Sequence, residues 1–396
     1  EITTRLVGSE MCIRDRVTKA IDVFPQFVRF PNTLEEVAAL ESIEECWFAR
    51  HLLACFYYNK RSYGKAIALW QRCVEMSPEF ADGWRGLAIH AWNKQHDYEL
   101  AARYLDNAYQ LAPQDARLLF ERDLLDKLSG ATPEKRLARL ENNLEIALKR
   151  DDMTAELLNL WHLTGHADKA ADILATRKFH PWEGGEGKIT SQFILNQLLR
   201  AWQHLDAREP QQASELLHAA LHYPENLSEG RLPGQTDNDI WFWQAICANA
   251  QGDQTEAMRC LRLAATGDRT INIHSYYNDQ PVDYLFWQGM ALRLLGEQQT
   301  AQQLFSEMKQ WAQEMAKTSI EADFFAVSQP DLLSLYGDLQ QQHKEKCLMV
   351  AMLASAGLGE VAQYESARAE LTAINPAWPK AALFTTVMPF IFNYVH

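Results

Sequence analysis

The stretches 53–78, LACFYYNKRSYGKAIALWQRCVEMSP, and 84–113, WRGLAIHAWNKQHDYELAARYLDNAYQLAP, decide the fold. Apolar residues recur in both with a helical period, and a proline closes each stretch. The stretches superimpose at a period near 34 if the second is allowed one extra residue in its inner turn. The matched positions are Leu53, Ala54, Tyr57, Ala66, Trp70, Cys73 and Pro78 in the first stretch, and Trp84, Leu87, Ala88, Ala101, Leu105, Ala108 and Pro113 in the second.

This spacing predicts two helices that pack closely as a pair. Small residues at Ala66 and Ala101 let the second helix approach the first, and large residues such as Trp70 fill the space between pairs. One pair cannot bury its own apolar face, so pairs must stack on one another. The two stretches resemble tetratricopeptide repeats, whose pattern is W-x2-L-G-x2-Y, then A-x3-F, then P.

Later stretches keep the small–x3–large pattern of the second helix. Ala170 and Leu174 form one such pattern, and Ala301 and Phe305 form another, with Gly289 at the close-approach position of the preceding helix. Residues 116–149 fit a degenerate unit and 344–376 a last one. We therefore expect an all-α fold, a right-handed tetratricopeptide-like solenoid of about eight helix pairs across 40–376. An unrelated all-helical bundle is the alternative.

Composition limits the classes of partner. The 396 residues hold 38 Lys and Arg against 52 Asp and Glu, a net charge of −14, which disfavours nucleic acid and anionic lipid as partners. No charge-free run reaches the roughly 20 residues that a membrane span needs. Apart from Cys12, the cysteines form no C-x-x-C pair and occupy apolar helical positions, as expected in a reducing cytoplasm.

The chain divides into five parts by sequence. Residues 6–16, LVGSEMCIRDR, resemble a translated sequencing adapter, so we expect 1–16 to be non-native; a natural N-terminal arm is the alternative. Residues 17–40 form a lead-in segment, 41–184 compact repeats and 185–376 longer repeats. The apolar tail 377–396 is a packing helix or strand, a docking peptide, or an out-of-frame end.

Four extended segments interrupt the second half, at 179–187, 223–238, 267–281 and 323–331. Their motifs HPWEGGEG, YPENLSEGR, YYNDQP and DFFAVSQPD resemble a family of large bacterial tetratricopeptide proteins. In that family a β-rich, galactose-mutarotase-like domain of unknown function precedes the helical repeats. The resemblance implies that this chain is the C-terminal helical part of a larger protein, and it carries over no catalytic residue.

The extended segments supply the candidate binding site. Each follows the second helix of a pair, so they are expected to project side by side from one edge of the solenoid. We name this surface the loop edge. It combines charges, amides and aromatic rings, although the segments could instead pack on one another to cap the repeats. Its members are His180, Trp182, Glu183, Glu186, Asn226, Glu229, Arg231, His274, Tyr276, Tyr277, Asn278, Asp279, Asp323 and Phe324.

No motif for catalysis is present. The glycines of 184–187 lack the Lys-Ser/Thr ending of a phosphate loop, and no H-E-x-x-H or G-x-S-x-G signature occurs. No cofactor and no metal site are therefore expected. The chain has 12 tryptophans, more than the repeat pattern needs. The pattern does not account for all of the following as core residues: Trp92, Trp182, Trp202, Trp243, Trp287 and Trp311. Packing between long repeats and a sugar-binding surface are the two interpretations.

These observations favour a non-catalytic scaffold that mediates protein–protein or interdomain contacts in the cytoplasm. Its partner is a second protein or the upstream domain, with a saccharide as a further candidate and neither nucleic acid nor membrane expected. The alternative is the helical portion of a carbohydrate-active enzyme whose catalytic domain lies upstream. For this chain alone, enzymatic activity is not expected.

Overall fold

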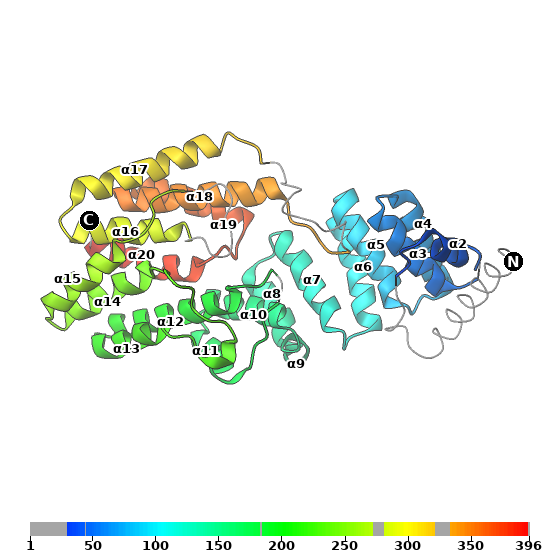
Figure 1. Cartoon of the computed structure of the whole chain (residues 1–396), viewed down its shortest axis with the longest axis horizontal. Coiled ribbons are helices and arrows are strands. Elements are labelled where there is room, and N and C mark those ends of the chain that lie inside the picture. The colour runs from blue at the N-terminus through cyan, green and yellow to red at the C-terminus, as the bar shows by residue number, and fades with distance from the viewer. Residues whose placement is uncertain (1–29, 44, 183, 272–280, 321–332, 395–396) are drawn as a thin grey trace. The chain divides into compact units, whose positions relative to one another are not determined.

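The computed structural model describes residues 30–43, 45–182, 184–271, 281–320 and 333–394, and these are helices joined by turns and loops (Figure 1). The chain forms two compact units. Unit 1 comprises Glu1–Ser129 and Ala322–Gly337, and unit 2 comprises Gly130–Glu321 and Asp338–His396. The segment that ends at Gly337 thus belongs to unit 1, although its neighbours in sequence on both sides belong to unit 2.

Unit 1 is built from two helical hairpins with one helix on either side. Helix α3 pairs with α4 and α5 pairs with α6, while α2 packs on α3 and α7 packs on α6. The elements are α2 (Leu34–Glu41), α3 (Trp47–Asn59), α4 (Tyr63–Met76), α5 (Ala81–His90), the π-helical turn η2 (Ala91–Gln95), α6 (Tyr98–Leu111) and α7 (Ala116–Leu128).

The hairpins of unit 1 close through the predicted small and large residues. Ala66, Trp70 and Ala101 are fully buried. A Cβ added at Gly86 would lie 2.3 Å from Cε2 of Trp70, so only glycine lets α5 lie against this indole. The repeat pattern therefore describes real packing in this unit.

The extra residue of the second repeat is accommodated in η2. In the first repeat the Ser62 N–H donates to the Tyr57 carbonyl, five residues back, whereas in the second the Asp97 N–H donates to the Ala91 carbonyl, six residues back. The turn then closes at His96, whose φ of 55° is left-handed. A π turn is the usual way for a helix to absorb a one-residue insertion, and such turns are frequent at functional sites.

Unit 2 contains five hairpins among its described residues: α10/α11, α12/α13, α14/α15, α16/α17 and α18/α19. Its elements are α8 (Pro133–Glu141), α9 (Leu144–Ala147), α10 (Asp151–Leu163), α11 (Ala167–Thr176), α12 (Lys188–Asp206), α13 (Pro210–Ala220), the short 3₁₀ turn η3 (Glu225–Leu227), α14 (Asn238–Ala250), α15 (Gln254–Ala264), α16 (Asp283–Leu294), α17 (Gln298–Met315), α18 (Leu339–Leu358), α19 (Val361–Ile374) and α20 (Ala381–Tyr394).

The helices of unit 2 approach one another as the pattern predicts. A Cβ at Gly289 would lie 2.3 Å from Cζ of Phe305, which is fully buried together with Ala301. Residues 116–149, predicted as one degenerate repeat, are divided between the units, because α7 packs in unit 1 and α8 packs on α10 in unit 2.

The apolar tail forms helix α20, drawn in red in Figure 1, which packs against α10 and α12. The Phe384 ring stacks on Trp287 at 5.8 Å, and the Phe390 ring meets Trp202 and Trp243 edge-on or tilted. Of the alternatives left open for the tail, the structure has the packing helix. It also gives Trp202, Trp243 and Trp287 a core role.

The prediction of an all-α fold of stacked helix pairs is confirmed for the described residues. The six cysteines in that part of the chain are unpaired and buried, and burial raises the thiol pKa of Cys55 and Cys247 to about 12. They act as small apolar residues. Within the described ranges, every helix is too short or too polar to span a membrane.

Candidate functional site

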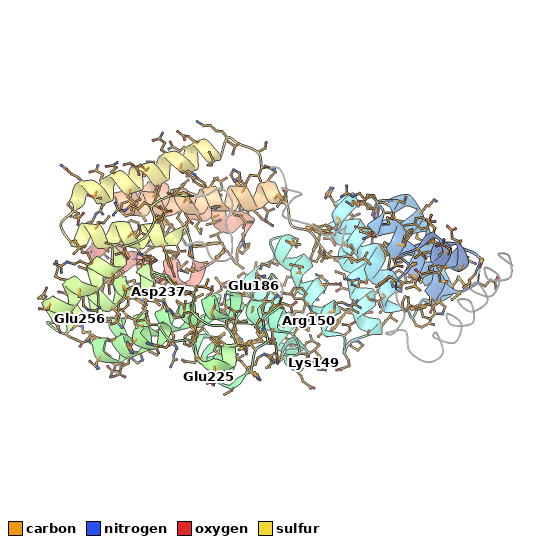
Figure 2. The ribbon with its side chains drawn as sticks, in the orientation of Figure 1. Lys149, Arg150, Glu186, Glu225, Asp237 and Glu256 are labelled. Carbon is orange, nitrogen blue, oxygen red and sulfur yellow. The ribbon has the colours of Figure 1, made fainter. Side chains whose placement is uncertain are left out.

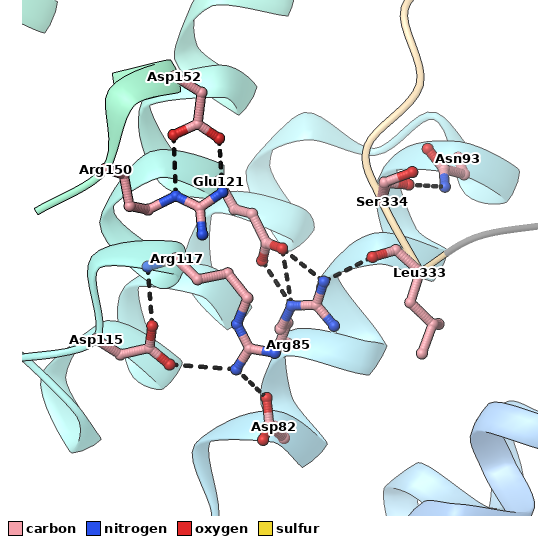
Figure 3. Close-up of polar contacts among 10 residues, drawn as sticks. All are labelled: Asp82, Arg85, Asn93, Asp115, Arg117, Glu121, Arg150, Asp152, Leu333 and Ser334. Carbon is pink, nitrogen blue, oxygen red and sulfur yellow. Dashed lines mark hydrogen bonds and ion pairs between the residues drawn. The ribbon is translucent and has the colours of Figure 1, made fainter. Parts of the chain in front are cut away.

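Unit 1 holds a piece of its own chain in the manner of a peptide ligand. The Asn93 side chain forms two hydrogen bonds with main-chain groups two residues apart: Nδ2 donates to the Ser334 carbonyl (2.8 Å), and Oδ1 accepts from the Tyr336 N–H (3.0 Å). Trp92 Nε1 donates to the Tyr336 carbonyl (2.8 Å), and Arg85 Nη2 donates to the Leu333 carbonyl (2.6 Å; Figure 3). We call Arg85, Trp92 and Asn93 the docking face.

The side chains of the held segment differ in exposure. Leu335 is buried and joins the apolar cluster of Tyr58, Trp70 and Leu105, and Leu333 is partly buried against the same cluster. Tyr336 is 41% exposed. The two leucines, two positions apart, thus contact the same apolar cluster of unit 1.

A buried ion pair positions Arg85. Both Nε and Nη2 of its guanidinium donate to the Glu121 carboxylate of α7, with Nε at 2.7 and 2.9 Å from the two oxygens, and both side chains are about 10% exposed. Beside this pair, Arg117 donates to Asp82 (2.6 Å) and Asp115 (3.2 Å; Figure 3). Burial alone would lower the pKa of Arg117, but these carboxylates outweigh it and raise the pKa. Two guanidinium groups and three carboxylates thus link α5 to α7.

Sequence reasoning did not select Arg85 or Asn93 as functional residues. Two signals pointed near them: the extra residue in the second inner turn, and Trp92 as a tryptophan whose core role was uncertain. The held segment, 333–337, follows the fourth extended segment directly, but nothing in its sequence shows where it docks. Only contacts between residues more than 240 positions apart reveal the docking face.

The loop edge is described in part. Its first two segments lie side by side in unit 2, because the Phe179 N–H donates to the Asn226 carbonyl (2.8 Å) and the Gly187 N–H donates to Glu229 Oε2 (2.9 Å). Asn226 Nδ2 donates to the carbonyls of Leu174 and Arg177. The polar groups of Asn226 and Glu229 thus hold the two loops together and support the start of α12.

The other described members of the loop edge differ in exposure. Glu186 is exposed, and the His180 side chain is 74% exposed (Figure 2 labels Glu186). Trp182 is half-buried over Gly185, where a Cβ would lie 1.9 Å from the indole. Arg231 pairs with Asp237 and lies 5.6 Å from the Tyr223 ring. The remaining members lie outside the described residues: Glu183, His274, Tyr276, Tyr277, Asn278, Asp279, Asp323 and Phe324.

A second charged cluster is enclosed in unit 2. Lys380, just before α20, donates to Asp283 (2.6 Å) and Asp239 (3.0 Å). Burial raises the pKa of Asp283 despite the nearby ammonium, while the two carboxylates raise the pKa of Lys380 against its own burial. Across the part of the chain that the structure describes, no group of His, Cys, Asp and Glu side chains could hold a metal ion.

Comparisons with known proteins assign no family to the chain, since no family model matches it. Similar solved structures include YrrB, a TPR protein with an unusual peptide-binding site (13% identity, 57% of this chain, 89% of that chain, TM-score 0.30). A second is Naa15/Naa10 bound to HypK-THB (13% identity, 99% of this chain, 52% of that chain, TM-score 0.39). A third is the human IFIT1 dimer with PPP-AAAA (14% identity, 89% of this chain, 78% of that chain, TM-score 0.29). The ligands and partners named here belong to those proteins.

Proposed function

We propose that this protein is a non-catalytic helical-repeat scaffold whose unit 1 binds an extended peptide. The observation that carries the proposal is the pair of hydrogen bonds between Asn93 and the main chain at Ser334 and Tyr336. An amide side chain both donates and accepts, so it satisfies an extended main chain as a neighbouring strand would.

All the hydrogen bonds from the docking face to the held segment go to main-chain atoms. Arg85, Trp92 and Asn93 together bind the carbonyls of Leu333, Ser334 and Tyr336 and the N–H of Tyr336. Main-chain hydrogen bonds supply affinity for the extended conformation, and side-chain pockets supply the choice of sequence. This division suits a scaffold that receives a segment of another protein.

The test uses the full chain with its own segment removed from the docking face. Residues 333–336 are replaced by Gly-Ser-Gly-Ser, which gives what we call the emptied chain, and a fluorescent, capped peptide of residues 333–337 is titrated. We expect saturable binding, weakened about ten-fold or more by Asn93→Ala, because a hydrogen-bonded amide contributes about 1–1.5 kcal/mol and here makes two bonds.

Asn59→Ala is the matched control, because Asn59 occupies the equivalent position 34 residues earlier and regular α3 ends there. It should leave peptide binding unchanged. Absence of saturable binding to an emptied chain whose helical circular dichroism is intact would contradict the proposed function.

The wider setting is also proposed rather than observed. The loop motifs support a bacterial protein of which this chain is the C-terminal part, with the loop edge contacting an upstream domain. The unpaired cysteines support a cytoplasmic location. The saccharide alternative has less support, since Asn226 and Glu229 already use their polar groups on neighbouring loops. If the loop edge binds a glycan or the upstream domain, Trp182→Ala weakens that binding without lowering the melting temperature by more than a few degrees.

A further inference from the structure

We infer that the docking face takes a neutral, internal peptide segment with apolar residues at alternate positions, and that such a segment competes with the chain's own Leu333–Tyr336. This inference rests on the proposed function and specifies its ligand. It depends on three features of unit 1. These are the burial of Leu333 and Leu335, the pairing of Arg85 with Glu121, and the occupation of the docking face by the chain's own segment.

The first feature sets the sequence of the ligand. Leu335 is only 7% exposed and lies in one cluster with Tyr58 and Trp70, and Leu333 packs against that cluster. Ser334 lies between them and is bound only through its carbonyl. A partner therefore needs apolar side chains at the positions of Leu333 and Leu335, while the position of Ser334 is permissive.

The second feature excludes a chain end as the preferred ligand. Arg85 is the cation nearest the held carbonyls, but Glu121 already accepts from both its Nε and Nη2. The remaining N–H of Nη2 donates to the Leu333 carbonyl, which is a neutral acceptor. A terminal carboxylate placed there would add a second anion beside the buried Glu121 carboxylate, which is unfavourable at low effective dielectric. Hence an internal segment fits better than a C-terminus.

The third feature makes binding competitive. The chain's own segment accepts the hydrogen bonds of Arg85, Trp92 and Asn93. Its Leu335 also fills the space in the apolar cluster that a partner's side chain would need. A tethered segment has an effective concentration of the order of millimolar. A free peptide must therefore displace it, and the intact chain should bind an added peptide more weakly than a chain whose segment no longer docks.

The experiment compares three full-length chains: the intact chain, Leu335→Ser, and the emptied chain as a second variant that does not depend on a single substitution. Each is titrated with four peptides. Two are the capped, neutral peptide of residues 333–337 and the same peptide carrying Leu335→Ser. The other two are a peptide of residues 328–333 with a free carboxylate at Leu333, where Arg85 donates, and the same peptide as its amide. Leu339→Ser in the chain is the matched control, because Leu339 lies just beyond the held segment and is 44% exposed.

We expect the capped peptide to bind Leu335→Ser and the emptied chain at least ten-fold more tightly than the intact chain, and the Leu339→Ser chain to behave like the intact chain. The serine-substituted peptide should bind the emptied chain at least ten-fold more weakly, and the free carboxylate should bring no gain. Equal affinity for intact and emptied chains would overturn the competition. Tighter binding of the free carboxylate would overturn the internal-segment preference. In both cases the proposed function stands, because it fails only if the emptied chain binds no peptide.

Discussion

Asn93 shows how one side chain gives a helix a recognition role. Its amide supplies both partners that an extended main chain needs, and Trp92 beside it supplies a third hydrogen bond. Asn59 is the same residue type one repeat earlier, where α3 ends without a π turn. Both repeats therefore have an asparagine at this position, and the π turn distinguishes Asn93 from Asn59.

His162 is a buried residue whose environment depends on a single protonation state. Its Nδ1 lies 2.9 Å from Gln192 Oε1 and its Nε2 lies 3.1 Å from Asn196 Nδ2, which also donates to the Ala167 carbonyl. A neutral ring that donates from Nδ1 and accepts at Nε2 satisfies both neighbours. A protonated ring would direct an N–H at the Asn196 amide. Burial accordingly lowers the pKa of His162 to about 4.

This lowered pKa predicts a loss of stability in acid. The unfolded chain binds a proton at His162 below about pH 6.5, whereas the folded chain does so only near pH 4. The free energy of unfolding should therefore fall by about 1.4 kcal/mol per pH unit between these values, or about 2 kcal/mol at pH 5. Urea unfolding at pH 7 and pH 5 should show a drop smaller by about this amount in His162→Gln. Equal drops in the two chains would contradict the assignment of a neutral ring.

At the scale of elements, η2 is the feature that separates the second hairpin from the first. The hydrogen bond that closes the loop spans one residue more in the second repeat, and the added residue widens the helix where Trp92 and Asn93 lie. A regular helix advances about 100° per residue, so a one-residue insertion changes the direction in which the flanking side chains point. We expect η2 to set the geometry of the docking face.

Deletion of Lys94 tests this role of η2. The first repeat closes the same hairpin with one residue fewer, so the shortened chain should keep its helical circular dichroism and most of its thermal stability. Binding of the capped peptide, measured in the emptied chain, should weaken at least ten-fold, because Trp92 and Asn93 would no longer point together at the segment. Lys94→Ala is the control: it removes the ammonium 4.4 Å from the Tyr63 ring but preserves chain length. Unchanged binding after the deletion would show that η2 is dispensable.

At the scale of the whole molecule, distant segments are held together by buried contacts within each unit. In unit 2, Lys380 joins the start of α20 to Asp239 of α14 and Asp283 of α16, which are 141 and 97 positions away. Asp239 is fully buried and Asp283 is 4% exposed. Removing one partner of such a group leaves an uncompensated charge inside the protein.

Lys380→Met should therefore destabilise unit 2 by about 3 kcal/mol or more, since two buried aspartates would lose their cation. Lys344→Met is the matched control, because Lys344 pairs with Glu370 at 2.7 Å but both side chains are more than half exposed, and such pairs contribute little. Urea unfolding followed by tryptophan fluorescence should separate the two variants clearly. A Lys380→Met chain as stable as Lys344→Met would show that the cluster does not hold α20 in place.

Much of the fold could be predicted from sequence because its determinants are local. The period of apolar residues, the small residues at Ala66, Ala101 and Ala301, and the close approach at Gly289 specify helices and the faces through which neighbours pack. In a repeat protein each hairpin touches mainly the next one along the chain, so local patterns carry most of the packing information. Even the extra residue of the second repeat is visible as a shift in spacing, although its conformation as a π turn is not.

The docking of Leu333–Tyr336 and the placement of α20 were decided only by tertiary structure. Both involve contacts across roughly 100 to 250 positions, and no periodicity relates residues so far apart. The loop edge lies between these cases: spacing predicted that its segments follow equivalent helices, but not that Asn226 and Glu229 would bind the neighbouring loop. Sequence thus determined which helices form and which neighbours they pair with, while long-range burial and main-chain hydrogen bonding decided which surfaces the chain itself occupies.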